Sequence, residues 1–301
     1  MDHAGGHPAS PFSFAFLSDP HLPLPDSPRE GGRFKQRLGR GSWRRKRHLR
    51  HRPEVLAALL EDIRARRPDH IAIGGDLINI ALPEEFERAR DWLASVGGPG
   101  DVTLVPGNHD AYVPARGMES WQPWMTGDDG GPGFPFRRDR GPVSFIGLSS
   151  AVPKPPGLAT GTLGASQIER AERLLSQARG RVRVVLVHHP VDGAASWRKA
   201  LTDRADLQAV IGRVGADLIL HGHLHHAHLG MVEGPSGGVP VIGVPSASMV
   251  HGSDRGDPAG WLHVEVAGDG LIVTTRGLGP DGFGRLSRFT FRPAAAWASG
   301  R

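Results

Sequence analysis

The sequence predicts an α/β fold in which two mixed β-sheets pack face to face with helices outside, giving four layers in the order α/β/β/α. In the first two thirds of the chain, short aliphatic runs alternate with segments whose apolar residues recur every three or four positions. Later runs follow one another through glycine-rich turns, which is typical of antiparallel strands. Together these patterns favour helices packed outside two sheets.

Strands are expected wherever a β-branched or aliphatic run ends at a polar segment. Five such runs occupy residues 12–18, 70–74, 102–105, 182–187 and 218–220. Later strands are expected at residues 239–244, 261–266 and 271–275, and the last two form a hairpin through residues 268–270.

Four amphipathic helices are expected between the strands. The first spans residues 53–67 and begins with Pro53, because proline suits the first turn of a helix. The second follows Pro83 in the same way. The apolar faces consist of Leu56, Leu59, Leu60 and Ile63; Phe86, Ala89, Leu93 and Val96; Ile168, Ala171, Leu175 and Ala178; and Leu207, Val210, Ile211 and Val214.

The composition predicts one large domain over residues 12–290, with residues 1–11 and 292–301 as flexible tails. The chain has 301 residues, enough for a substantial core. It lacks both a run of about 18 apolar residues and a secretory leader, so we expect a cytoplasmic protein. It has no cysteine, which excludes disulfides and thiol chemistry.

Five polar segments follow the expected strands in a fixed order. They are Asp19-Pro20-His21, Gly75-Asp76, Gly107-Asn108-His109-Asp110, His188-His189-Pro190 and Gly222-His223-Leu224-His225. Carboxylate and imidazole groups suit borderline divalent metals. Strand ends are where loops of an α/β sheet converge on a ligand. The glycines would allow tight turns beside a crowded centre.

This order resembles the calcineurin-like metallophosphoesterases, whose pattern is D-x-H, G-D, G-N-H-D, H-x-P and G-H-x-H. The resemblance covers roughly residues 12 to 250. It implies two divalent ions, with Mn foremost and Fe, Zn, Co or Ni as alternatives, which share a hydroxide for in-line attack on a phosphodiester or pyrophosphate. By resemblance, the ligands are Asp19, His21 and His225 for the first ion, Asn108, His188 and His223 for the second, and Asp76 as the bridge.

The same resemblance implies roles for His109 and Asp110 beside the ions. The family position of His109 faces the substrate, where a protonated imidazole stabilises phosphate charge or protonates the leaving oxygen. We expect Asp110 to orient and charge that imidazole, or alternatively to cap the next segment. The remaining nearby histidines are expected to be supporting or structural; they are His189, His221, His226 and His228.

Residues 29–52 form a strongly basic insertion, with eleven Lys and Arg against one Glu in a chain whose net charge is +5. Three interpretations stay open. The segment is a solvated loop, or it binds nucleic acid, for which stacking aromatics are sparse, or it lies on an anionic membrane. In the last case the substrate or membrane contacts are Trp43, Arg44, Arg45 and Arg47.

A second insertion at residues 111–142 is irregular and apolar, and it either covers the site, holds an acyl chain or packs onto the domain. The combination resembles hydrolases of UDP-2,3-diacylglucosamine in lipid A synthesis, which implies a lipid-linked nucleotide sugar cleaved at the inner face of the membrane. A soluble cyclic-nucleotide or general phosphodiesterase is the alternative. A metal-stabilised nucleic-acid or membrane binding protein is the non-enzymatic alternative, but such a protein has no need of His109.

Overall fold

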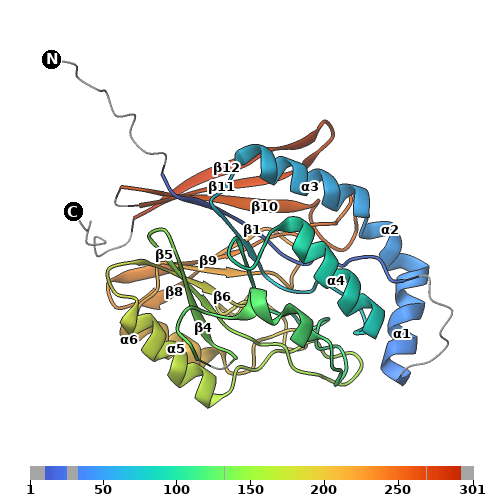
Figure 1. The fold of residues 1–301 in the computed structure, drawn as a ribbon, viewed down its shortest axis with the longest axis horizontal. Coiled ribbons are helices and arrows are strands. Elements are labelled where there is room, and N and C mark those ends of the chain that lie inside the picture. Colours follow the sequence, from blue (N-terminus) through green and yellow to red (C-terminus); the bar gives the residue numbers. More distant parts are fainter. Residues whose placement is uncertain (1–10, 26–32, 132, 269, 293–301) are drawn as a thin grey trace.

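The computed structural model describes residues 11–25, 33–131, 133–268 and 270–292, and two six-stranded sheets pack against each other in it (Figure 1). The strand orders are β12-β11-β10-β1-β2-β3 and β4-β5-β6-β7-β9-β8. The predicted fold class is therefore confirmed. The expected flexible tails lie outside the described residues, except for residues 11 and 292.

The first sheet is parallel where it carries the site. Its parallel strands are β1 (Ser13–Leu17), β2 (His70–Ile73) and β3 (Val102–Leu104), connected through α3 (Pro53–Arg66) and α4 (Pro83–Val96). Right-handed crossovers put both helices on the outer face. Three antiparallel strands extend this sheet: β10 (Gly260–Ala267), β11 (Gly270–Gly279) and β12 (Gly282–Phe291).

The second sheet has four parallel strands in its middle and one antiparallel strand at each edge. Its strands are β4 (Phe136–Arg140), β5 (Val143–Gly147), β6 (Val182–Leu186), β7 (Leu218–His221), β8 (His228–Gly234) and β9 (Gly237–Gly243). Helices α5 (Ala165–Gln177) and α6 (Arg204–Val214) cover its outer face, where they pack on Ile146 and Val185. The alternate residue Phe145 points between the sheets and meets Phe14 of β1 with ring centroids 5.0 Å apart.

The loops after the parallel strands of both sheets meet at one end of the molecule. The amide of Asp19, after β1, donates to Gly75 O after β2 at 2.9 Å. The ring of His188, after β6, hydrogen bonds to Gly74 O at 2.7 Å, so it joins the second sheet to the first. The amide of Gly222, after β7, donates to His188 O at 3.1 Å. Segments far apart in sequence are thereby fixed together.

The described part of the basic insertion is helical, so interpreting it as a loop is wrong there. It consists of α1 (Phe34–Ser42), the short π-helix η1 (Trp43–Arg47) and α2 (His48–Arg50), at the end of the molecule toward which β1 runs (Figure 1). Trp43 is buried, which corrects its expected contact with a membrane. Residues 29–32 lie outside the described residues.

The second insertion packs onto the fold and is only partly irregular. It contains the 3₁₀ helix η2 (Met118–Met125) and strand β4. Trp121 and Phe136 are fully buried, and Trp121 Nε1 donates to Phe86 O at 3.0 Å. These side chains belong to the core, so the acyl-chain interpretation is wrong. None of the helices in the described part of the chain is long and apolar enough to cross a membrane.

Candidate metal centre

The seven predicted ligand side chains converge where the loops of the two sheets meet. On one side, Nε2 of His225 lies 3.1 Å from Asp19 Oδ1 and 3.2 Å from His21 Nε2. On the other side, Nε2 of His188 lies 3.2 Å from Asn108 Oδ1. The ring of His223 packs at 5.1 Å from that of His188. The structure therefore gathers the expected residues into two adjoining groups.

Asp76 lies between the two groups. Its Oδ2 atom is 3.3 Å from His188 Nε2 and 3.9 Å from His21 Nε2. Its Oδ1 atom accepts a hydrogen bond of 2.7 Å from the amide of His109. A carboxylate in this position can reach an ion in either group, which is the geometry of a bridging ligand.

The backbone is unusual at the same residues. Seven described residues other than glycine have a positive φ, and five of them are expected ligands: Asp19 (56°), His21 (42°), Asp76 (55°), His223 (70°) and His225 (60°). Asp and His tolerate this left-handed region better than bulky residues, yet each such residue costs on the order of 1 kcal/mol. The strain is concentrated at the predicted centre, as is common at functional sites.

Two glycines leave room for the ligand carboxylates. A Cβ atom on Gly107 would lie 2.3 Å from Asp76 Oδ1, and one on Gly222 would lie 2.3 Å from Asp19 Oδ2. Gly75 is different, because its φ of +95° itself favours glycine. The expectation of tight glycine turns is thus correct for Gly75, whereas Gly107 and Gly222 matter for space.

The electrostatics of the centre favour cations. Burial alone would raise the pKa of Asp76, but the charges of His188 and His109 outweigh it and hold that pKa well below its usual range. Burial would lower the pKa of His188, yet Asp76 and Asp19 raise it to about 10. Two buried carboxylates that stabilise a positive charge on a buried imidazole will also stabilise a metal ion.

The expected ligand rings are oriented by hydrogen bonds from their other nitrogen. Nδ1 of His188 donates to Gly74 O at 2.7 Å, and Nδ1 of His21 lies 3.3 Å from Ile78 O. Nε2 of His223 donates to Lys199 O at 3.1 Å. A carbonyl partner fixes a proton on that nitrogen, so the opposite nitrogen is the one available to a metal ion.

His109 lies beside the centre, but Asp110 does not act on it as expected. Nδ1 of His109 hydrogen bonds to Asn79 O at 2.6 Å. The carboxylate of Asp110 instead accepts bonds from the amides of Asp76, Leu77, Ile78 and Gly107. Neither orientation of the imidazole nor capping of the next segment describes this role. Asp110 ties together the two loops that carry Asp76 and Asn108.

The order of the ligand segments is that of a known family. Residues 12–227 match the family model for calcineurin-like phosphoesterases. The chain belongs to the calcineurin-like phosphoesterase family. It is a metal-dependent phosphoester hydrolase, and the family depends on divalent metals.

This phosphoesterase is similar to two curated phosphodiesterases and to a plant phosphatase. It is 28% identical to a probable cyclic nucleotide phosphodiesterase of Synechococcus over 71% of this chain and 78% of that protein. It is 31% identical to the glycerophosphodiester phosphodiesterase GpdQ of Enterobacter lignolyticus over 41% of this chain and 42% of that protein. The purple acid phosphatase PPD1 from yellow lupin shares the fold, with a TM-score of 0.59 at 14% identity over 94% of this chain and 54% of the lupin chain, so the phosphoesterase spans about half of it.

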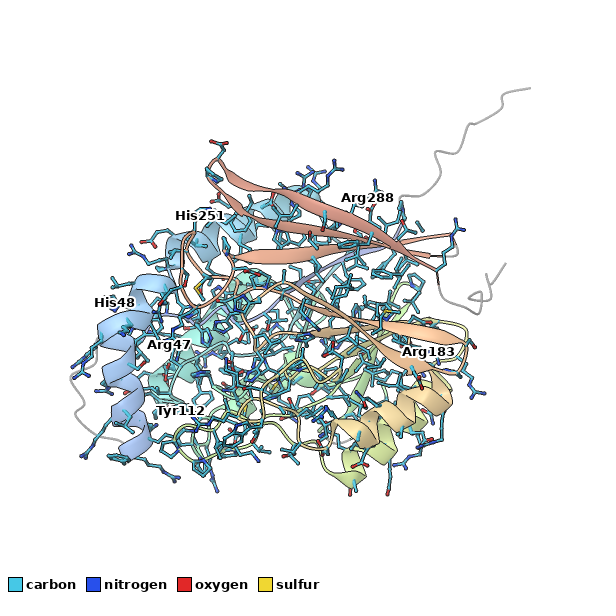
Figure 2. The ribbon with its side chains drawn as sticks, turned by 180° about the vertical axis from the view of Figure 1, so that it is seen from behind. Arg47, His48, Tyr112, Arg183, His251 and Arg288 are labelled. Atoms are coloured by element: carbon cyan, nitrogen blue, oxygen red, sulfur yellow. The ribbon has the colours of Figure 1, made fainter. Side chains whose placement is uncertain are left out.

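The basic insertion brings two residues to the centre, one of which the sequence did not single out. Arg47 Nη2 lies 3.2 Å from His21 Nδ1, and His51 is buried with its ring centroid 4.6 Å from that of His21. Figure 2 shows Arg47 beside α1, at the end of the molecule opposite Arg183. No local motif marks His51, since its position follows from how α2 packs. The other candidates of the insertion, Arg44 and Arg45, are exposed.

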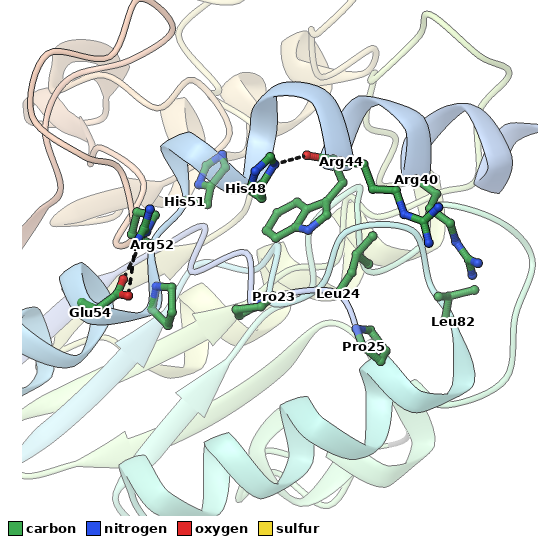
Figure 3. A pocket seen from close by; sticks show the side chains of 12 residues that line it. Pro23, Leu24, Pro25, Arg40, Arg44, His48, His51, Arg52, Glu54 and Leu82 are labelled. Atoms are coloured by element: carbon green, nitrogen blue, oxygen red, sulfur yellow. Dashed lines mark hydrogen bonds and ion pairs between the residues drawn. The ribbon is translucent and has the colours of Figure 1, made fainter. Parts of the chain in front are cut away.

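Two cavities meet at His51. One, of about 400 Å³, opens onto the centre, and its basic lining residues are Lys46, Arg47, Arg50, Lys199 and Arg255. The other, of about 520 Å³, lies on the far side of α2 and is lined by Pro23, Leu24, Trp43 and Arg44, among others (Figure 3). The cavity at the centre is the one that fits an anionic substrate.

Proposed function

We propose that this phosphoesterase hydrolyses phosphodiesters with two divalent cations, for which Mn is the first candidate. The first cation is held by Asp19, His21 and His225 and the second by Asn108, His188 and His223. Asp76 bridges them, and its position between the two groups is the observation that carries the proposal. Because both sheets supply ligands, we also propose that residues 12–290 act as one catalytic unit.

The chain's own groups account for substrate binding and proton transfer. When bound, two such cations activate a water molecule and bind phosphate oxygens. Arg47 lies over His21, and no ion pair to a carboxylate within 4.0 Å is found for it among the described residues. A phosphate oxygen is the natural partner for such a guanidinium. Arg47 therefore orients the diester at the first cation.

His109 is placed to serve the leaving group. Its Nδ1 atom is bonded to Asn79 O, so Nε2 is left to face the cavity. Burial and the charge of Arg47 lower the pKa of His109 to about 4, which makes the free imidazole neutral at pH 7. An anionic phosphate beside the ring opposes both effects. Substrate binding thus converts His109 into a proton donor for the departing oxygen.

A small phosphodiester is the preferred substrate class. The similar proteins act, by their names, on cyclic nucleotides and on glycerophosphodiesters. The burial of Trp43 and Trp121 removes two apolar contacts that an acyl chain would need. The basic cavity suits the charged diester itself rather than a lipid tail.

The test is hydrolysis of a cyclic nucleotide, a glycerophosphodiester and bis(p-nitrophenyl) phosphate by Mn-loaded protein. His109→Ala is expected to retain both metals and to lose about 10² to 10⁴ in kcat. His226→Ala is the matched control, because that imidazole is exposed and pairs with Asp257. The absence of turnover on every diester, or full activity of His109→Ala, would contradict the proposal.

A second candidate is hydrolysis at an anionic lipid surface, including the lipid-linked nucleotide sugar. Phe34, Leu38 and Leu49 are 71%, 49% and 56% exposed on the basic helices. Exposed apolar residues among arginines suit an interfacial helix. Co-sedimentation with phosphatidylglycerol vesicles tests it, and Leu49→Glu should abolish binding. Equal binding to neutral and anionic vesicles, or none, contradicts it.

A further inference from the structure

His51 is a buried imidazole from the basic insertion that lies against the first group of ligands. It is 4% exposed. One potential ligand atom from each of His21, His51 and His225 lies within 4.8 Å of the others. The ring centroid of His51 is 4.6 Å from that of His21 and 5.4 Å from that of His225. No segment matching the family pattern contains His51, because it lies 30 residues beyond His21.

The ring of His51 is held in one orientation from outside the centre. Its Nδ1 atom lies 3.0 Å from Ser248 Oγ and 3.2 Å from Ser246 Oγ. The hydroxyl of Ser246 donates to Asp19 O at 2.7 Å, so it can only accept from His51. Nδ1 therefore carries the proton, and Nε2 keeps its lone pair.

The backbone around His51 is fixed as well. His51 forms an antiparallel bridge with Met249, and the amide of Arg52 donates to Ser248 O at 2.9 Å. Trp43 stacks nearly parallel to the His51 ring, with an interplanar angle of 12° and centroids 6.4 Å apart. A ring held by backbone, hydroxyl and indole contacts is preorganised for a ligand rather than free to turn away.

His51 thus repeats the arrangement of the other ligand rings. In His188, and with a longer contact in His21, one nitrogen is held by an oxygen atom and the other faces the centre. A neutral imidazole with a free lone pair is the form that binds a metal.

We propose that His51 Nε2 is an additional ligand of the first cation, supplied by the inserted helix. This inference rests on the two-metal site proposed above and adds a third imidazole to His21 and His225. The first site would then have three imidazole ligands and the second two, and additional nitrogen ligands favour ions such as Co, Ni and Zn. The first site should therefore retain its ion longer than the second. The insertion then completes the metal centre as well as the substrate cavity.

The test uses the full chain stripped of metal and titrated with Co²⁺ alone. Affinities come from calorimetry, and the ligand set comes from the exchangeable imidazole N–H resonances that bound Co²⁺ shifts outside the normal proton range. We expect His51→Ala to lose one such resonance and to bind the tighter Co²⁺ at least tenfold more weakly. His48→Ala is the matched control, because this histidine lies three residues before His51 in α2 and its Nδ1 hydrogen bonds to Trp43 O at 2.9 Å. It should match the unmodified chain.

A second variant keeps the proposal testable if His51→Ala does not fold. His51→Phe preserves an aromatic ring against Trp43 but has no nitrogen, so it should show the same two losses. Unchanged Co²⁺ affinity and an unchanged set of shifted resonances would overturn the proposal. Loss of turnover with both ions bound as before would also overturn it, because His51 would then contact the substrate. Both readouts are independent of turnover, so failure of the phosphodiesterase proposal is distinguished from failure of this one.

Discussion

Substitution of Gly107 by alanine should misplace the carboxylate of Asp76, the proposed bridging ligand, although alanine can adopt the φ of residue 107. Gly107 is not among the glycines with positive φ, so alanine is compatible with its conformation. The added Cβ would lie 2.3 Å from Asp76 Oδ1, 2.6 Å from the Asp76 amide nitrogen and 2.7 Å from His188 Cε1. Atoms cannot approach so closely. Asp76 or the loop that carries Gly107 must therefore move.

The size of the effect follows from these contacts. Restoring normal separations requires a shift of roughly 1 Å, and a displacement of that size costs about 10²-fold in rate. Asp76 Oδ2 would move with respect to both His188 and His21, so both cation sites should weaken. Overpacking should also reduce the free energy of unfolding by about 1 to 3 kcal/mol.

Two quantities are measured for the variant and the unmodified chain: kcat/KM for bis(p-nitrophenyl) phosphate, and the amount of Mn that stays bound after dialysis. Gly41→Ala is the control, since a Cβ there has no atom within 4 Å and lies in α1. It should keep full activity and unfold no more easily, because alanine favours helix. The reasoning is refuted if Gly107→Ala binds two ions and turns over as fast as the unmodified chain.

Three further predictions concern stability. Burial lowers the pKa of His70 to about 3, so between pH 6.5 and pH 3 only the unfolded chain binds a proton there. From pH 7 to pH 5 the free energy of unfolding, measured by urea titration, should therefore fall by about 2 kcal/mol more in the unmodified chain than in His70→Gln. Equal decreases in the two proteins would contradict this. Asp62→Ala removes the carboxylate that accepts a 2.6 Å hydrogen bond from the buried Arg276. It should lower the free energy of unfolding by about 3 to 5 kcal/mol and leave the metal content unchanged. Arg288→Ala, which removes an exposed ion pair, is the control and should change the free energy of unfolding little. Mn at about 100 times its Kd should raise the free energy of unfolding by about 2.7 kcal/mol. The gain is measured by thermal shift with and without chelator, and a similar gain in Asp76→Ala would disprove the site.

The parts of the fold that the sequence predicted are those whose signals are local. Helices α3 and α4 begin at Pro53 and Pro83, as expected. Helix α1 was missed because its polar and small residues are buried and its apolar residues are exposed. It buries Gln36 and Gly39, where Gln36 Nε2 donates to Ile80 O at 3.1 Å, and it exposes Phe34 and Leu38. A search for an apolar stripe cannot find a helix that packs through an amide and a glycine.

Strand β4 was missed for a related reason. Its sequence is FRRDR, and charge argues against a buried strand. Arg138 is nevertheless only 3% exposed, because its guanidinium donates to backbone carbonyls, among them Val102 O at 2.6 Å. Tertiary partners of this kind are invisible in the sequence.

The residues of the candidate site also divide into those with a local sequence signal and those placed only by tertiary contacts. The seven expected ligands, which the structure brings together, could be singled out in the sequence because their five short segments each follow a strand. Arg47 was expected only as one of several basic contacts, and His51 was not expected at all. The position of His51 depends on the contacts that residues 50–52 make with residues 246–250, which no local pattern records.

In the proposed two-metal centre, metal binding and folding are coupled, because the same residues carry strain, charge and potential ligand atoms. The pairs Asp19 and His21, and His223 and His225, each have positive φ at two alternate positions. This conformation lets both members of a pair point to the centre, at a cost on the order of 1 kcal/mol for each residue. Two divalent ions would offset this strain, and a strained, preorganised loop loses little further freedom on binding. On this proposal the chain gives up some stability without metal for a centre whose ligands are already in position. A substitution as small as Gly107→Ala should therefore affect stability, metal affinity and turnover together.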